Sequence, residues 1–71
     1  MLLTIETERE APGRWIAEVV ELPGVMLYGK TEADAIERVK ELARSVVAER
    51  MSYGEPLPGS GELVFEQHRA V

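Results

Sequence analysis

One stretch of helical periodicity, residues 32–51, constrains the fold of this 71-residue chain more than any other feature. Thr31 is a good N-cap residue in front of it, and Asp34 three positions later makes an approximate capping box. Within the stretch, apolar residues recur at the spacing of three and four that turns one side of a helix toward a core. They are Ala35, Ile36, Val39, Leu42, Ala43, Val46 and Val47. We expect Leu42→Asp to unfold the domain, because the new charge would be buried without a partner.

Four other segments are predicted to be β-strands, three from their alternating pattern and residues 25–29 as a short strand that is apolar on both sides. They are residues 2–9, 14–21, 25–29 and 62–68. Pro12-Gly13 and Pro23-Gly24 mark short reversals between the first three, and the second pair fits the central positions of a type II turn. Short reversals predict an antiparallel meander. A right-handed crossover through the helix then puts the fourth strand beside the first, in the order 3-2-1-4.

The predicted fold is a single α+β domain over residues 1–71, a two-layer β-β-β-α-β arrangement. One helix is about 10 Å across, whereas four strands about 4.8 Å apart make a wider sheet, so one sheet face stays uncovered. The second strand is apolar on both sides, because Trp15 and Val19 alternate with Ile16 and Val20. Trp15 fits the core better than an interface, since one helix needs a large residue beneath it. A contiguous exposed apolar patch predicts self-association, as a dimer or tetramer, or a partner protein, although scattered surface Val and Ile are also normal.

Composition excludes several kinds of site. The chain has no Cys and one His, so disulfides, thiolate chemistry and an imidazole-rich metal site within one chain are excluded. The net charge is −5 with no basic block, so we expect no direct contact with nucleic acid. An acidic surface favours a basic protein partner, or simply keeps the domain soluble. The absence of Asn is in the direction of thermophile composition.

No apolar run approaches the roughly 18 residues of a membrane span, so we expect no membrane association. The first ten residues, MLLTIETERE, become acidic too early for a secretory signal peptide. The sequence therefore predicts a cytoplasmic protein.

Four short motifs follow one another in the first half of the chain. They are GRWIAEV at 13–19, ELPG at 21–24, YGKT at 28–31 and EADAI at 32–36. In this order and spacing they resemble the HicB-like antitoxin family. Val20 departs from the pattern, because the family often has Pro before ELPG, but this difference leaves the turn unaltered.

The resemblance implies a partial ribonuclease H-like fold and a role in a toxin–antitoxin system. Such domains neutralise a small basic ribonuclease of the HicA type, which attacks mRNA, by covering its RNA-binding surface. Many members carry a C-terminal DNA-binding segment, and we expect none in these residues. The alternative is a solitary homo-oligomeric member of the family without a toxin partner.

Candidate site residues follow from the second and third strands. The expected partner-binding residues share one strand face or lie on a predicted edge strand: Ile16, Glu18, Val20, Met26 and Tyr28. The expected turn and cap residues are Pro23, Gly24, Gly29 and Thr31.

An enzymatic role is the third hypothesis. Ribonuclease H-type catalysis needs several converging carboxylates to hold two metal ions. The acidic residues on or beside the first two strands are Glu6, Glu8, Glu18 and Glu21. However, Asp34 is the only Asp, and alternating acids are also typical of a solvated strand. His68 fits a surface or edge position better than a general base, and no serine lies in a nucleophile motif. We therefore expect no catalytic residue, metal or cofactor.

Overall fold

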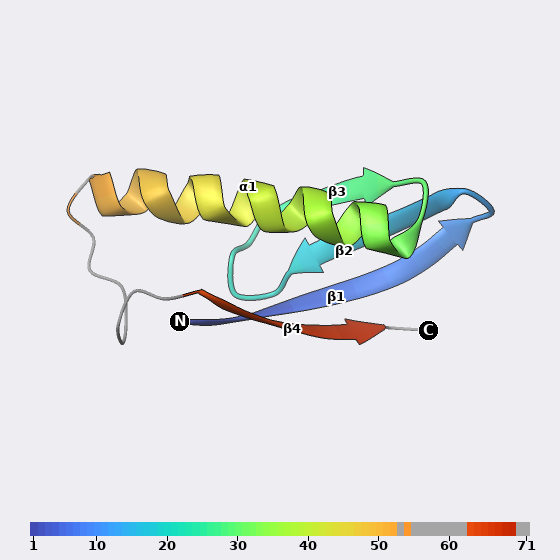
Figure 1. Ribbon diagram of the computed structural model, residues 1–71, viewed down its shortest axis with the longest axis horizontal. Helices are drawn as coiled ribbons and strands as arrows, with labels where there is room; N and C mark the ends of the chain where they lie inside the picture. The colour runs from blue at the N-terminus through green and yellow to red at the C-terminus, as the bar shows by residue number, and fades with distance from the viewer. Residues whose placement is uncertain (53, 55–62, 70–71) are drawn as a thin grey trace.

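The computed structural model describes residues 1–52, 54 and 63–69, which form four strands and one helix in the order β-β-β-α-β (Figure 1). The elements are β1 (Leu2–Ala11), β2 (Arg14–Val19), β3 (Met26–Gly29), α1 (Glu32–Ser52) and β4 (Val64–Arg69). The sheet order is β3-β2-β1-β4, which confirms the predicted α+β fold and strand order. Neighbouring pairs are antiparallel except β1 and β4, which run parallel. No helix of these described ranges is long and apolar enough to cross a membrane.

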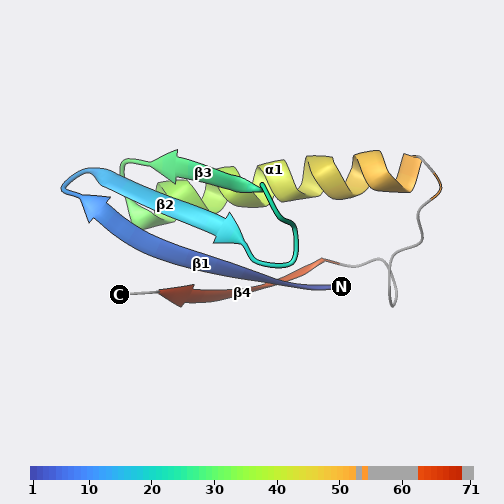
Figure 2. The same cartoon turned by 180° about the vertical axis from the view of Figure 1, so that it is seen from behind.

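Helix α1 packs against only one face of the sheet. It lies in front of β2 and β3 in Figure 1 and behind them in Figure 2. The covered face carries the odd-numbered side chains of β1 and β2, among which Leu3, Ile5 and Val19 are fully buried. The buried apolar core comprises Leu3, Ile5, Ala17, Val19, Leu22, Val25, Ala35, Ile36, Val39, Ala43 and Val47.

The burial of the helix differs from the sequence expectation at two positions, Leu42 and Val46. Leu42 is only partly buried and lies at the margin of the core, whereas Val39 and Ala43 are fully buried. The basis for expecting Leu42→Asp to unfold the domain is therefore wrong, because a charge there can still reach water. Trp15 is likewise partly buried and packs against the core, in agreement with its expected role.

The predicted turn and cap are confirmed at atomic detail. The N–H of Val25 donates to the carbonyl of Leu22 at 3.0 Å, and Gly24 has φ of 88°, so Pro23 and Gly24 occupy the central positions of a type II turn. At the helix start, the N–H of Asp34 donates to Thr31 Oγ1 at 3.0 Å. Asp34 Oδ2 in turn accepts the N–H of Lys30 at 3.1 Å, one residue earlier than in a regular capping box.

Strand limits differ from the expected ones by a few residues. β1 continues to Ala11 through an irregularity in register between Arg9 and Ala11. β2 ends at Val19. The N–H of Val20 still donates to the carbonyl of Thr4, but the N–H of Thr4 donates to the Glu21 carboxylate instead of to the backbone of β2. Glu62, the first residue of the expected fourth strand, and the connection at 55–61 lie outside the described residues.

Gly29 has a role that the turn pattern did not reveal. It is the last residue of β3, and its φ is not in the left-handed region. A Cβ atom placed on it would lie 2.4 Å from the backbone nitrogen of Ala35 and 2.8 Å from its Cα. The first turn of α1 therefore lies directly on this glycine, and only the absence of a side chain allows the close approach.

We expect Gly29→Ala to destabilise the domain by about 2–3 kcal/mol, because backbone on both sides must shift to admit the methyl group. In a domain of this size the melting temperature would fall by about 10–20 °C, measurable by circular dichroism. Gly13→Ala is the control: Gly13 has φ of 72° but no atom within 4 Å of a new Cβ. The Gly13→Ala variant should lower the free energy of unfolding by only about 1 kcal/mol. Equal losses for the two variants would contradict the close-contact explanation.

Candidate protein-binding face

The sheet face opposite α1 is uncovered in the described part of the chain, and we call it the open face. The strand register places its side chains in rows across the sheet, because paired residues point to the same side. Its members are Leu2, Thr4, Glu6, Glu8, Ile16, Glu18, Met26, Tyr28, Val64, Glu66 and His68.

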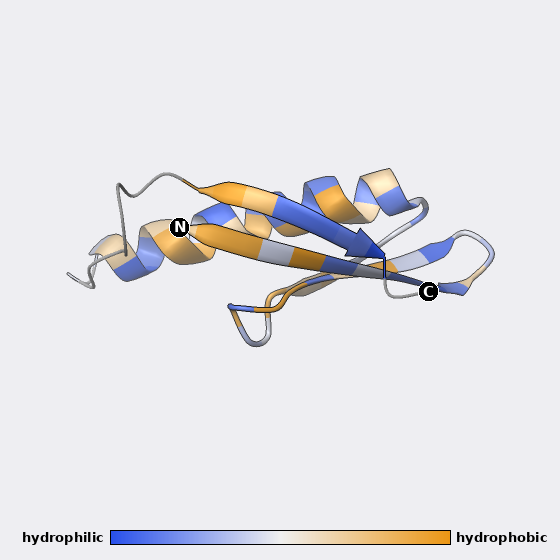
Figure 3. Ribbon diagram, turned by 90° about the horizontal axis from the view of Figure 1, so that it is seen from below, coloured by the Kyte–Doolittle hydropathy of each residue, from blue (hydrophilic) through white to orange (hydrophobic). Residues whose placement is uncertain are grey.

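Apolar side chains occupy two parts of the open face. Leu2 and Val64 pair where β1 and β4 begin, and they are 54% and 52% exposed. Tyr28 pairs with Ile16 across β3 and β2, next to Met26; Met26 and Tyr28 are 40% and 45% exposed. Figure 3 shows the same trend along β1 and β4, which both begin apolar and end hydrophilic. Such exposed apolar area on a sheet is typical of an interaction surface.

The structure brings four of the five expected partner-binding residues together. Ile16, Glu18, Met26 and Tyr28 lie on adjacent strands with Glu18 paired to Met26 and Ile16 paired to Tyr28. Val20 is exposed but lies beyond the end of β2, in the turn beside Thr4. β2 therefore ends one residue before Val20, and the predicted strand does not extend to it.

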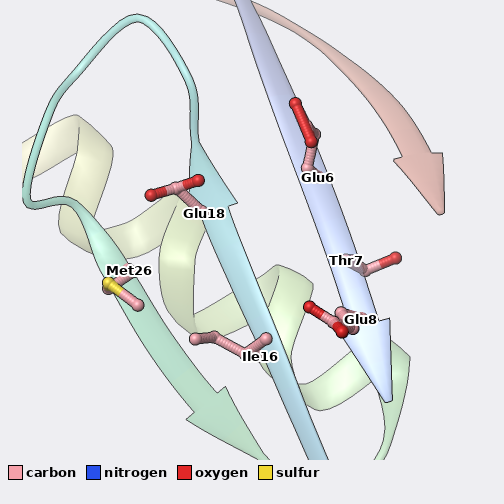
Figure 4. A pocket seen from close by; sticks show the side chains of 6 residues that line it. All are labelled: Glu6, Thr7, Glu8, Ile16, Glu18 and Met26. Carbon is pink, nitrogen blue, oxygen red and sulfur yellow. The ribbon is translucent and has the colours of Figure 1, made fainter. Parts of the chain in front are cut away.

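Carboxylates surround a shallow hollow of about 220 Å³ in the middle of the open face. Figure 4 shows Glu6 and Glu8 on β1 and Glu18 on β2, with Ile16 and Met26 forming the apolar part of the lining. The structure gives none of these three carboxylates an ion pair or hydrogen bond within the described ranges. Glu6 and Glu18 are directly paired across the strands, where like charges are destabilising.

Other charged groups on this side already have partners. The Arg14 guanidinium lies 4.4 Å from the ring centroid of Tyr28, and its Nε is 3.9 Å from Glu10. His68 Nε2 lies 3.2 Å from Glu66 Oε1. The open face therefore keeps an excess of negative charge, and it is concentrated at the hollow.

The Glu21 carboxylate does not contribute to this excess of negative charge. Its two carboxylate oxygens accept the backbone N–H and the hydroxyl of Thr4, at 2.7 and 2.8 Å. The backbone hydrogen bond from Thr4 lowers the pKa of Glu21. Among the described residues, no three His, Cys, Asp or Glu side chains gather where they could hold a metal ion.

An ion pair on the helix side holds β4 in place, and sequence reasoning missed it. Arg69 Nε donates to Glu32 Oε2 at 2.9 Å, and the hydroxyl of Thr7 donates to the same oxygen at 2.7 Å. The Arg69 guanidinium also lies 5.5 Å from the ring centroid of Trp15. These contacts connect the end of β4 with the start of α1 and the middle of β1. From the sequence, the position of Glu32 in the first helical turn predicts only a favourable interaction with the helix dipole.

The Glu32–Arg69 pair makes the domain sensitive to acid. The hydrogen bond from Arg69, with a second from Thr7, lowers the pKa of Glu32 from 4.5 to about 2. Since the folded-state pKa is depressed, this stabilisation is present above pH 4.5 and is lost as the pH falls toward 2. We expect Glu32→Gln to flatten the fall of melting temperature over that range. Glu37→Gln, on an exposed part of α1, should show the same steep fall of melting temperature with pH as the natural protein. Equal pH profiles of the melting temperature for the two variants would contradict the assignment of acid sensitivity to Glu32.

Comparison of the chain with family models, with curated proteins and with solved structures finds no match. The functional argument therefore depends on the open face itself and on the motifs in residues 13–36.

Proposed function

We propose that this chain is an antitoxin-type, HicB-like protein-binding module that neutralises a small basic ribonuclease of the HicA type. The observation that carries the proposal is the open face, where three carboxylates without an ion-pair partner among the described residues lie beside exposed apolar side chains. The β-β-β-α-β order is also the arrangement that the resemblance implies.

The chemistry of the open face suits a surface that binds RNA. Such a surface presents Lys and Arg side chains, which have long aliphatic stems and charged ends. The stems would pack on Ile16 and Met26 while the charged ends meet Glu6, Glu8 and Glu18. Complementary charge speeds association and selects the partner, and the apolar contacts slow dissociation.

The proposed mechanism is occlusion, in the cytoplasm, without catalysis by this chain. A sheet face laid over the RNA-binding surface excludes the substrate, so no nucleophile, metal or cofactor is required. Inhibition should therefore be stoichiometric and should need no incubation time beyond binding.

The proposal is tested by titrating the purified protein into a HicA-type ribonuclease encoded in the same genome, with cleavage of a labelled RNA as the readout. We expect cleavage to fall linearly with added protein and to stop at a fixed small molar ratio. Unchanged cleavage at about a tenfold molar excess would contradict the proposed function.

A further inference from the structure

The free edge of β3 has backbone groups that are available for pairing. The N–H of Val19 donates to the carbonyl of Val25 at 3.0 Å, so this pair is hydrogen-bonded. Hydrogen-bonded and non-bonded pairs alternate along an antiparallel ladder. The bonded positions of β3 are therefore Leu27 and Gly29, paired with β2. The N–H and C=O groups of Met26 and Tyr28 point away from β2, to the outside of the sheet.

The two edge strands of the sheet, β3 and β4, differ in how well they are protected against pairing with a strand of another chain. Proteins usually protect an edge strand with charged residues or proline. β4 carries Glu66, His68 and Arg69. β3, by contrast, consists of Met26-Leu27-Tyr28-Gly29 and carries no charge and no proline. Among the described residues, β3 is therefore the edge strand that is less protected against pairing with another strand.

A shallow groove between β3 and α1 accompanies this edge. Leu27 and Leu42, both partly buried, line it together with Arg38, Glu41 and Ser45. The groove thus presents one base and one acid that are three residues apart on the helix. Arg38 also forms an exposed ion pair with Asp34 on its own helix, with Nε 3.3 Å from Oδ2. When two copies are related by a two-fold axis, the same surface of each copy forms the contact, and the two surfaces run in opposite directions. Across such an axis we expect the two helices to run antiparallel, with Arg38 of each copy on the side of Glu41 of the other.

We propose that two copies of this chain pair through antiparallel β3 strands and form one continuous eight-stranded sheet. Pairing centred on Leu27 sets Met26 opposite Tyr28 of the second copy, and the two outward-facing pairs then exchange four hydrogen bonds. Because β3 is short, the apolar groove and the Arg38–Glu41 contacts supply the rest of the interface. Both open faces remain uncovered, so this inference is independent of the proposed function.

The first test changes the edge and measures the dimer dissociation constant by sedimentation equilibrium, from about 1 μM to 1 mM. The natural chain should reach twice its mass of 7.9 kDa. Met26→Pro removes an outward N–H without breaking the ladder to β2, and should weaken the dimer at least tenfold. The matched control is Gln67→Pro on β4. The N–H of Val64 donates to Met1, so the N–H of Gln67 points outward at the other edge, and its loss should leave the dimer unchanged.

The second test uses charge and does not depend on tolerance of proline. Arg38→Glu and Glu41→Arg should each weaken self-association about tenfold, because each variant opposes like charges across the axis. An equimolar mixture of the two variants should restore the dimer, since the two acidic groups of one chain then face the two basic groups of the other. Far-UV circular dichroism verifies folding of each variant.

Two results would overturn the inference. One is a natural chain that stays monomeric to 1 mM, which would leave the edge to a different partner. The other is a dimer that is insensitive to Met26→Pro and to both charge variants. Glu41→Arg lies outside the open face, so it should still inhibit the ribonuclease. Loss of the dimer with retained inhibition separates this proposal from the proposed function.

Discussion

Val39→Asp is expected to abolish the folded state at 25 °C. Val39 is fully buried in the middle of the contact between α1 and the sheet. An aspartate there loses apolar contacts and places a carboxyl group where no described residue offers a partner, at a cost of about 4–5 kcal/mol or more. Small domains lie near the lower end of the usual 5–15 kcal/mol of stability. The far-UV circular dichroism of the variant should therefore lack the helical signal.

Leu42→Asp is the matched control for this prediction, since it introduces the same group less than one turn away. Leu42 lies at the margin of the core, so the carboxylate can reach water, and the loss should be about 1–2 kcal/mol. A folded Val39→Asp protein, or an unfolded Leu42→Asp protein, would show that the side of α1 facing the sheet has been assigned incorrectly.

The second large effect concerns binding. Glu6→Lys combined with Glu18→Lys should weaken binding to a HicA-type ribonuclease at least about 100-fold, because like charges brought together at an interface cost several kcal/mol. Both residues line the hollow on the open face, and neither has an ion-pair partner within the described ranges. Isothermal titration calorimetry measures the dissociation constants directly.

Glu37→Lys combined with Glu49→Lys provides the control, because it changes the net charge equally but lies on exposed positions of α1. Its affinity should stay within about threefold of the natural protein at physiological salt, where separated charges are largely screened. Equal losses in the two double variants would indicate general electrostatic attraction rather than contact with the open face.

Much of the fold could be predicted because local patterns and chain connectivity agree. The Pro23-Gly24 turn, the Thr31 cap and the helical spacing each fix one feature, and the confirmed strand order follows from the crossover. The sequence of β2 does not indicate which side of the sheet α1 covers, because β2 is apolar on both sides. β1 decides it, since Leu3 and Ile5 lie on one side and Glu6 and Glu8 on the other.

Features that depend on distant residues could not be predicted. Glu32 and Arg69 are 37 positions apart, and no local pattern indicates that they meet. Gly29 appeared to be a turn residue because glycine often is, whereas its importance comes from the helix packed on it. The expected set of partner-binding residues followed β2 and β3 and missed Glu6 and Glu8, which the register of β1 brings to the same hollow.

The central claim is that the open face binds a basic protein, and an NMR titration tests it most directly. A HicA-type ribonuclease is added to the ¹⁵N-labelled chain, and the amide shifts are followed residue by residue. We predict that the largest changes fall on open-face residues, above all Glu6, Glu8, Ile16 and Glu18, while exposed residues of α1 such as Glu49 stay unchanged. Changes confined to α1, or no changes at saturating ribonuclease, would contradict the account.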